Sequence, residues 1–160
     1  MRATSTAHST SIEHVRNKQA LAINVVFTTT RSTLTALKRA GELARQLGGK
    51  IRIIVPHVVP YPLPLNRPAV APPHVEQHFR TLAGEAAPDL ELWIDTRVDI
   101  RLCRDAQETV RQALSPQSIV VIGGRERLWP FTSEARLARA LRREGHQVIF
   151  VNEKGGHRDF

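Results

Sequence analysis

Residues 23–60 read INVVFTTTRSTLTALKRAGELARQLGGKIRIIVPHVVP and predict a strand, a helix and a second strand. Residues 20–28 form a short, nearly continuous apolar run, which is typical of a strand buried on both faces. A single helix between two strands implies that the strands are parallel and that the crossover is right-handed. The helix is expected to end at its paired glycines, and its apolar stripe is predicted to comprise Leu34, Leu37, Gly41, Ala44 and Gly48, with Ala40 and Leu47 beside it.

The rest of the chain continues the alternation of strands and helices. Residues 90–102 have an apolar residue or Thr at every even position, which predicts an edge strand or a bent pair of strands with one buried face. Residues 119–122 and 148–151 are further strand candidates, and helices are expected near Pro73, after Asp105 and after Thr132-Ser133. This order predicts an α/β fold with a five-stranded, doubly wound parallel sheet.

The composition limits the class of protein. The chain has 160 residues, of which 41% are hydrophobic, and this suits one folded domain with a buried core. We expect a disordered leader over residues 1–19, the domain over residues 20–152 and a tail over residues 153–160. The sequence has no apolar run near the ~18 residues of a membrane-spanning helix. The single cysteine and the absence of an apolar signal segment predict a cytoplasmic protein.

The net charge of +8 raises the question of nucleic-acid binding. The chain has no polybasic run and little interleaving of aromatic with basic residues, so the stacking part of such a surface is missing. Nucleic acid is therefore not favoured as a partner.

Three stretches together are similar to a known family. They are residues 23–60, residues 98–114 (VDIRLCRDAQETVRQAL) and residues 118–152, which combine a strand, a glycine pair, a helix and a closing strand. On these stretches the chain resembles the universal stress protein family over residues 20–152. The resemblance implies a Rossmann-like sandwich of the adenine nucleotide alpha hydrolase type and a stress-response or regulatory role. It also implies a nucleotide cleft between the ends of the first and fourth strands.

Two departures from the family pattern indicate a degenerate cleft. The family's acidic residue at the end of the first strand falls on Thr28, and the second glycine of its phosphate loop falls on Glu126 or Arg127. Glycines at such a loop let backbone N–H groups approach phosphate oxygens, so their loss weakens a phosphate site. The candidate cofactor is ATP or another adenine nucleotide, and the residues expected to line its cleft are Thr28, Thr29, Thr30, Gly123, Gly124, Arg125, Thr132 and Ser133.

Other features have both a functional and a structural interpretation. The hydroxyl run that begins at Thr28 could bind a phosphate or ribose, or simply cap the next helix. His74 and His78 have the spacing of a helical metal pair but lack a clear third ligand, so no metal site is predicted. Cys103 lies between two arginines, but a packed, inert thiol is favoured.

We find no set of nucleophile, base and orienting group, and this favours a non-catalytic domain. Two alternatives stay open. One is a small phosphate-ester hydrolase that uses Thr28 or Ser133. The other is a basic module that binds nucleic acid or an acidic protein through the last helix, whose arginines are Arg136, Arg139, Arg142 and Arg143.

The last strand is expected at the edge of the sheet, where unpaired backbone groups favour association. Family resemblance implies a homodimer through this strand, formed by Val148, Ile149, Phe150 and Val151.

Overall fold

The computed structural model describes residues 21–66, 74, 76–79, 81, 96–125 and 132–153. The isolated residues 74, 76–79 and 81 are helical, as expected from the sequence. The predicted leader, residues 126–131 and residues 154–160 of the tail lie outside the described residues. The labelled elements in chain order are β1 (Ala22–Val26), α2 (Thr30–Leu47), β2 (Lys50–Val58), β3 (Thr96–Cys103), α4 (Ala106–Ala113), β4 (Ile119–Gly124), α5 (Ser133–Arg143) and β5 (Gln147–Asn152).

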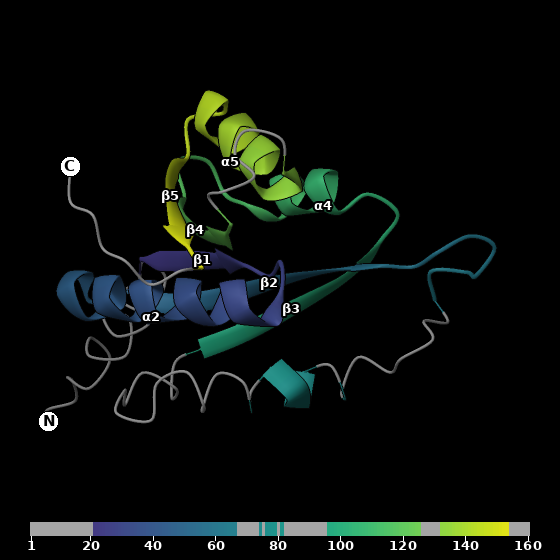
Figure 1. Ribbon diagram of the computed structural model, residues 1–160, viewed down its shortest axis with the longest axis horizontal. Coiled ribbons are helices and arrows are strands. Elements are labelled where there is room, and N and C mark those ends of the chain that lie inside the picture. Colours follow the sequence, from purple (N-terminus) through teal and green to yellow (C-terminus); the bar gives the residue numbers. More distant parts are fainter. Residues whose placement is uncertain are drawn as a thin grey trace, which may run out of the picture.

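The strands form one five-stranded sheet in the order β3-β2-β1-β4-β5, and every neighbouring pair is parallel. The predicted doubly wound fold is therefore confirmed. Helix α2 covers one face of the sheet, while α4 and α5 cover the other (Figure 1). From β1 the chain adds β2 and β3 on one side and then β4 and β5 on the other, so the order of the strands reverses between β1 and β4. Such switch points open a crevice at the carboxyl edge of a parallel sheet.

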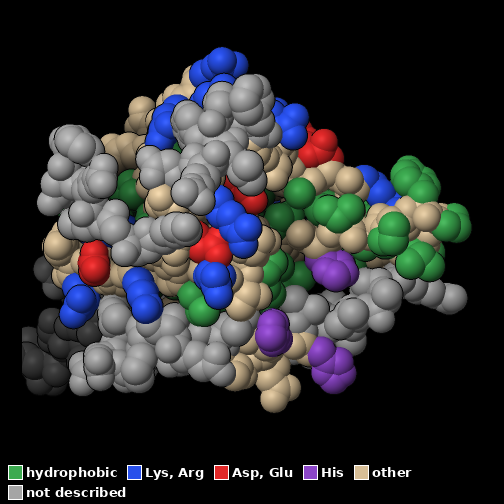
Figure 2. Space-filling model, viewed as in Figure 1, with side chains coloured by type: hydrophobic (Ala, Val, Ile, Leu, Met, Phe, Trp, Pro, Cys, Tyr) green, Lys and Arg blue, Asp and Glu red, His purple; other side chains and the backbone are tan. Residues whose placement is uncertain are grey.

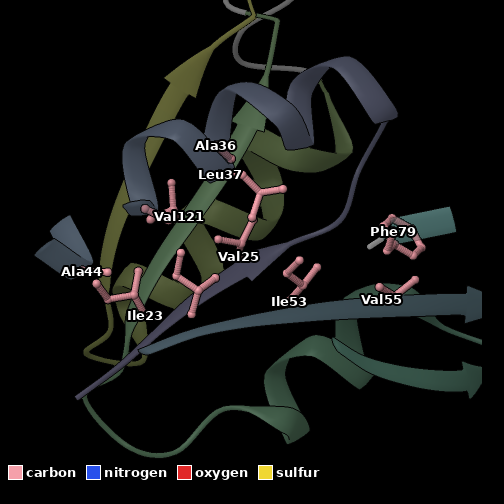
Figure 3. Packing of buried hydrophobic residues seen from close by; sticks show 11 residues of the cluster. Ile23, Val25, Ala36, Leu37, Ala44, Ile53, Val55, Phe79 and Val121 are labelled. Carbon is pink, nitrogen blue, oxygen red and sulfur yellow. The ribbon is translucent and has the colours of Figure 1, made fainter. Parts of the chain in front are cut away.

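Two apolar cores lie on the two faces of the sheet. Ile23 and Val25 of β1 point into the core beneath α2, together with Leu37 of that helix (Figure 3). Val26 points the opposite way and packs with Leu141 of α5. Successive side chains of this central strand thus enter the apolar cores on opposite faces of the sheet, which is why its sequence is continuously apolar.

The buried stripe of α2 differs in part from the expected one. Leu37, Ala40, Gly41 and Ala44 are buried as predicted, but Leu47 is 50% exposed. Gly48 is also exposed and acts as the C-cap in the left-handed conformation. Most of the buried residues are small, which lets the helix lie close to the sheet, whereas the predicted stripe contained more leucine. The buried residues are Ser32, Thr33, Ala36, Leu37, Ala40, Gly41 and Ala44.

Strand β3 is an edge strand, as its alternation predicted, although residues 91–95 lie outside the described part of the chain. Val98 and Ile100 pack against the α2 core, and Asp99 lies near Arg52 on the other face. Arg52 also donates from Nη1 to the carbonyl oxygen of Ala113 at 2.9 Å. This arginine therefore ties the end of α4 to the sheet and helps to fix that helix.

Gly123 and Gly124 end β4 at points of close packing. A Cβ atom on Gly123 would lie 1.9 Å from the backbone carbonyl oxygen of Ser32, in the first turn of α2. A Cβ atom on Gly124 would lie 2.5 Å from Cζ of Phe150, at the far end of a side chain. Both glycines are buried, and their missing side chains let α2 and Phe150 pack on the end of β4.

The two glycines provide a matched test of this packing. Gly123→Ala is expected to lower the free energy of unfolding by about 3 kcal/mol, because backbone must move to admit the methyl group. Gly124→Ala is expected to cost about 1 kcal/mol, since the Phe150 ring can rotate. Urea unfolding of both variants measures the difference. Equal losses would contradict the close backbone approach at Gly123.

None of the helices in the described part of the chain combines the length and the hydropathy of a membrane-spanning segment.

Candidate functional site

The hydroxyl-rich turn after β1 joins β1, α2 and β4. Thr28 donates from Oγ1 to the carbonyl oxygen of Gly123 at 3.0 Å, and its N–H donates to Oγ1 of Thr33 at 3.2 Å. Thr29 is the N-cap of α2 and accepts from the N–H of Ser32 at 3.3 Å. The capping interpretation of this turn is therefore confirmed for Thr29, while the Thr28 hydroxyl bonds to β4.

A cavity of about 240 Å³ opens at the carboxyl edge of the sheet. It lies where β1 and β2 end and where the first turns of α4 and α5 face each other. Its apolar lining residues are Val26, Phe27, Pro56, Ala106, Val110 and Leu137, and its polar ones are Thr28, Gln107, Ser133 and Glu134.

The cavity brings together two of the eight predicted cleft residues, Thr28 and Ser133. Thr132 instead caps α5 and accepts from the N–H of Ala135 at 3.2 Å. Thr29, Thr30 and Arg125 are exposed, and the glycine pair is buried under its neighbours. Ligand binding by these six residues stays a prediction.

Sequence reasoning missed Phe27, Gln107 and Glu134 as lining residues. A signal was available for the two polar ones, because both stand in the first turn after a predicted N-cap. In a doubly wound fold, the first turns of helices at the carboxyl edge face the ligand crevice.

The polar side chains of the cavity bond to one another and to the backbone. Ser133 donates from Oγ to Oε2 of Glu134 at 3.1 Å. Gln107 donates from Nε2 to the carbonyl oxygen of Ser133 at 3.4 Å, so it bridges α4 and α5. Glu134 is half-buried, and its Cβ lies 3.5 Å from the place a Cβ atom would take on Gly124. The base of the Glu134 side chain therefore packs beside the end of β4.

A second polar cluster joins the end of β5 to α2. Glu153 accepts at Oε2 from Nε of Arg125 at 2.8 Å and from Oγ of Ser32 at 3.3 Å. Arg31 lies 3.5 Å from the other carboxylate oxygen, and the Glu153 side chain is only 7% exposed. The hydrogen bond from Arg125 lowers the pKa of Glu153. This carboxylate also places a negative charge near the N-terminus of α2, where the helix dipole favours it.

The other sequence candidates lie apart from the cavity. His74 and His78 are exposed, and the described residues contain no group of three His, Cys, Asp or Glu placed to hold a metal. Cys103 is buried, consistent with a packed thiol.

The last helix carries its arginines on the outer side. Arg136, Arg142 and Arg143 are exposed and Arg139 is half-buried, and basic side chains are visible over α5 at the top of Figure 2. Arg142 donates from Nη2 to the carbonyl oxygen of Val148 at 3.3 Å. One of these arginines is therefore tied to the edge strand.

Solved structures share this arrangement. A universal stress protein from Archaeoglobus fulgidus superposes with a TM-score of 0.56 at 16% identity, covering 86% of this chain and 97% of its own. A universal stress protein in complex with cAMP gives a TM-score of 0.51 at 19% identity, covering 84% and 98%. The chain has the universal stress protein fold.

This agrees with the family resemblance seen in the sequence. No protein-family model matches the chain, and neither does any curated protein. The likeness therefore lies in the universal stress protein fold, and function must be argued from the cavity and from the chain's own side chains.

The Glu153 cluster predicts how the stability of this universal stress protein fold depends on pH. Because the folded pKa of Glu153 lies below its ordinary value of 4.5, the folded state binds protons less readily than the unfolded chain. The stabilisation is complete above that value and is lost as pH falls through the lowered folded pKa. Glu153→Gln is therefore expected to be less stable than wild type at neutral pH, with the difference shrinking as pH falls below 4.5 and through the lowered folded pKa.

Urea unfolding at pH 7, 5, 4 and 3 measures this difference. Glu42→Gln is a matched control, because Glu42 forms only an exposed ion pair with Arg39. A constant difference between wild type and Glu153→Gln at all four values would contradict the role of the carboxylate.

Proposed function

We propose that the protein is a non-catalytic stress-response or regulatory domain whose state depends on a small ligand bound at the carboxyl edge of the sheet. The ligand class is an adenine nucleoside or nucleotide, bound in a cleft that is degenerate for phosphate. One observation carries this proposal, namely the mostly apolar cavity at the carboxyl ends of β1 and β2, with a few polar groups at one side. The universal stress protein structure solved with cAMP supports the same ligand class.

The hydrolase alternative has one observation in its favour, the hydrogen bond from Ser133 to Glu134. A carboxylate that accepts from a serine hydroxyl is the beginning of a nucleophile–base pair. Within the described residues, no other side chain donates to Glu134, so these residues supply no orienting group for such a pair. The balance therefore favours binding over turnover.

Isothermal titration calorimetry with adenosine, AMP, cyclic AMP and ATP with Mg²⁺ tests the proposal. At least one of the four is expected to bind saturably. Ala106→Leu, which fills the cavity from α4, is expected to weaken that binding tenfold or more. Ala22→Leu is the matched control, because Ala22 is exposed at the opposite edge of the sheet.

The same mixtures are followed by chromatography for conversion of the ligand. Unchanged ligand is expected after hours of incubation, and turnover would favour the hydrolase alternative. No binding of any of the four ligands to folded protein would overturn the proposed function.

The proposal includes a homodimer through β5, as the sequence suggested. In the described sheet, β5 pairs with β4 on one side only. The N–H groups of Gln147 and Glu153 point toward β4, so by alternation the N–H and carbonyl of Val148 point outward. Val148 and Phe150 pack against the α4–α5 core, and Ile149 and Val151 against the α2 core. The dimer would therefore form through the backbone of the edge more than through these side chains.

Val148→Pro tests this contact, because it removes an outward N–H without removing a bond to β4. Sedimentation velocity is expected to show at least a tenfold weaker dimer. Arg142→Ala, which uncovers the carbonyl of Val148, is expected to strengthen the dimer. An unchanged dimer in both variants would place the interface elsewhere, and a wild-type monomer at all concentrations would contradict it.

A further inference from the structure

The outer face of α5 carries a row of arginines that its own helix does not neutralise. The four side chains are Arg136, Arg139, Arg142 and Arg143, and all but Arg139 are exposed. No residue three or four positions away from any of them is acidic. Residues at these spacings are neighbours on a helix surface, so here the arginines are neighbours of one another. Like charges at such positions destabilise a helix, so helix formation does not explain this row.

The two carboxylates of α5 are directed to other contacts. Glu134 accepts from Oγ of Ser133, and the base of its side chain packs beside the end of β4. Glu144 accepts from Nε of Arg111 on α4, and this hydrogen bond raises the pKa of Arg111. The acidic residues of α5 therefore do not cancel the positive charge on its outer face.

The other long helices of the described chain show a different pattern. Arg39 in α2 pairs with Glu42, and Arg111 in α4 pairs with Glu108, in both cases three positions apart. Pairs of opposite charge at this spacing stabilise a solvated helix face. The outer face of α5 thus differs from the solvated faces of its neighbours, and this difference points to a partner.

Arg136 gains least from its place in the helix. It lies near the N-terminus of α5, where its N–H donates to the carbonyl oxygen of the N-cap Thr132. The helix dipole presents partial positive charge at this end, so an arginine is disfavoured there. Arg142 and Arg143 lie in the last turn, where the dipole favours cations. The dipole therefore explains the arginines at the end of α5 but not the one at its start.

The spacing of the row indicates what it could bind. Arg136 and Arg143 are seven residues apart, which places them about 10.5 Å apart along the helix and on nearly the same side. A second helix with acidic residues at heptad spacing presents carboxylates at the same interval. Guanidinium groups pair well with carboxylates, because two N–H donors match the two oxygens. Nucleic-acid sites usually contact more phosphates than two helical turns can reach.

We propose that the outer face of α5 binds an acidic helical segment of a protein partner, with Arg136 and Arg143 as the main contacts. Carboxylates of the partner supply the compensation that the helix itself lacks. This surface goes beyond the proposed function, because neither arginine is among the residues that line the cavity.

A synthetic helical peptide of about three heptads, with glutamates at heptad spacing along one face, is the probe. Fluorescence anisotropy of the labelled peptide measures its binding to the full chain at about 50 and 200 mM salt. Wild type is expected to bind saturably and more weakly at the higher salt concentration. A peptide with the same glutamates spread around the helix, and one with glutamine in their place, are both expected to bind at least about tenfold more weakly.

Paired variants test the arginines themselves. Arg136→Gln/Arg143→Gln is expected to weaken binding at least about tenfold. Lys38→Gln/Arg45→Gln removes the same charge from exposed positions of α2, on the other face of the sheet, and is expected to change the affinity less than about threefold. Arg136→Glu/Arg143→Glu is expected to lose the glutamate peptide and to bind a peptide with lysines at the same positions. Circular dichroism verifies that each variant is folded.

Several results would contradict this surface. Absence of binding to folded wild type would overturn the proposal. Equal binding of the peptide with spread glutamates would show that only net charge matters, and equal losses in the two double glutamine variants would place the contact elsewhere. Single-stranded or duplex DNA of about twenty nucleotides that binds more tightly and displaces the peptide would assign the face to nucleic acid instead.

Discussion

The contact between Gly123 and the first turn of α2 sets the geometry of the carboxyl edge. The Ser32 carbonyl lies where a side chain at this position of β4 would stand, so only glycine permits the approach. Thr28 extends the same junction, because its hydroxyl bonds the Gly123 carbonyl and its N–H bonds Thr33. A glycine that could have admitted a phosphate is thus used to dock a helix. The open space moves to the opposite face, between α4 and α5.

Carboxylates of the chain itself lie near the N-termini of α2 and α5. Glu153 lies near the N-terminus of α2 and pairs with Arg31 and Arg125. Glu134 lies in the first turn of α5, beside the cavity. Helix N-termini attract negative charge, and here the charge comes from within the protein. The described edge of the sheet is therefore supplied with anions before any ligand arrives, despite a net charge of +8.

The periodicity of hydrophobic residues was sufficient to predict the sheet, because the pattern within each strand shows whether one or both of its faces are buried. The continuous apolar run of β1 and the alternation in β3 correctly predicted a central and an edge strand. Helix α2 was less predictable, since Leu47 belongs to an apolar pattern yet points to solvent. Contacts between distant residues were beyond such reasoning. Ser32 and Glu153 are separated by 121 positions, and nothing local to either residue indicates that they meet.

Helix α5 connects the cavity with the exposed edge of the sheet. Its first turn supplies Ser133 and Glu134 to the cavity, and near its other end Arg142 donates to the carbonyl of Val148 on β5. The bond from Gln107 to the Ser133 carbonyl is long at 3.4 Å, so the α4–α5 contact at the cavity is weakly fixed by hydrogen bonding. A ligand in the cavity can change the exposed edge at β5 only if α5 can adopt two placements and the ligand binds one of them more tightly than the other. A helix that touches both places is the element through which such a difference would be transmitted.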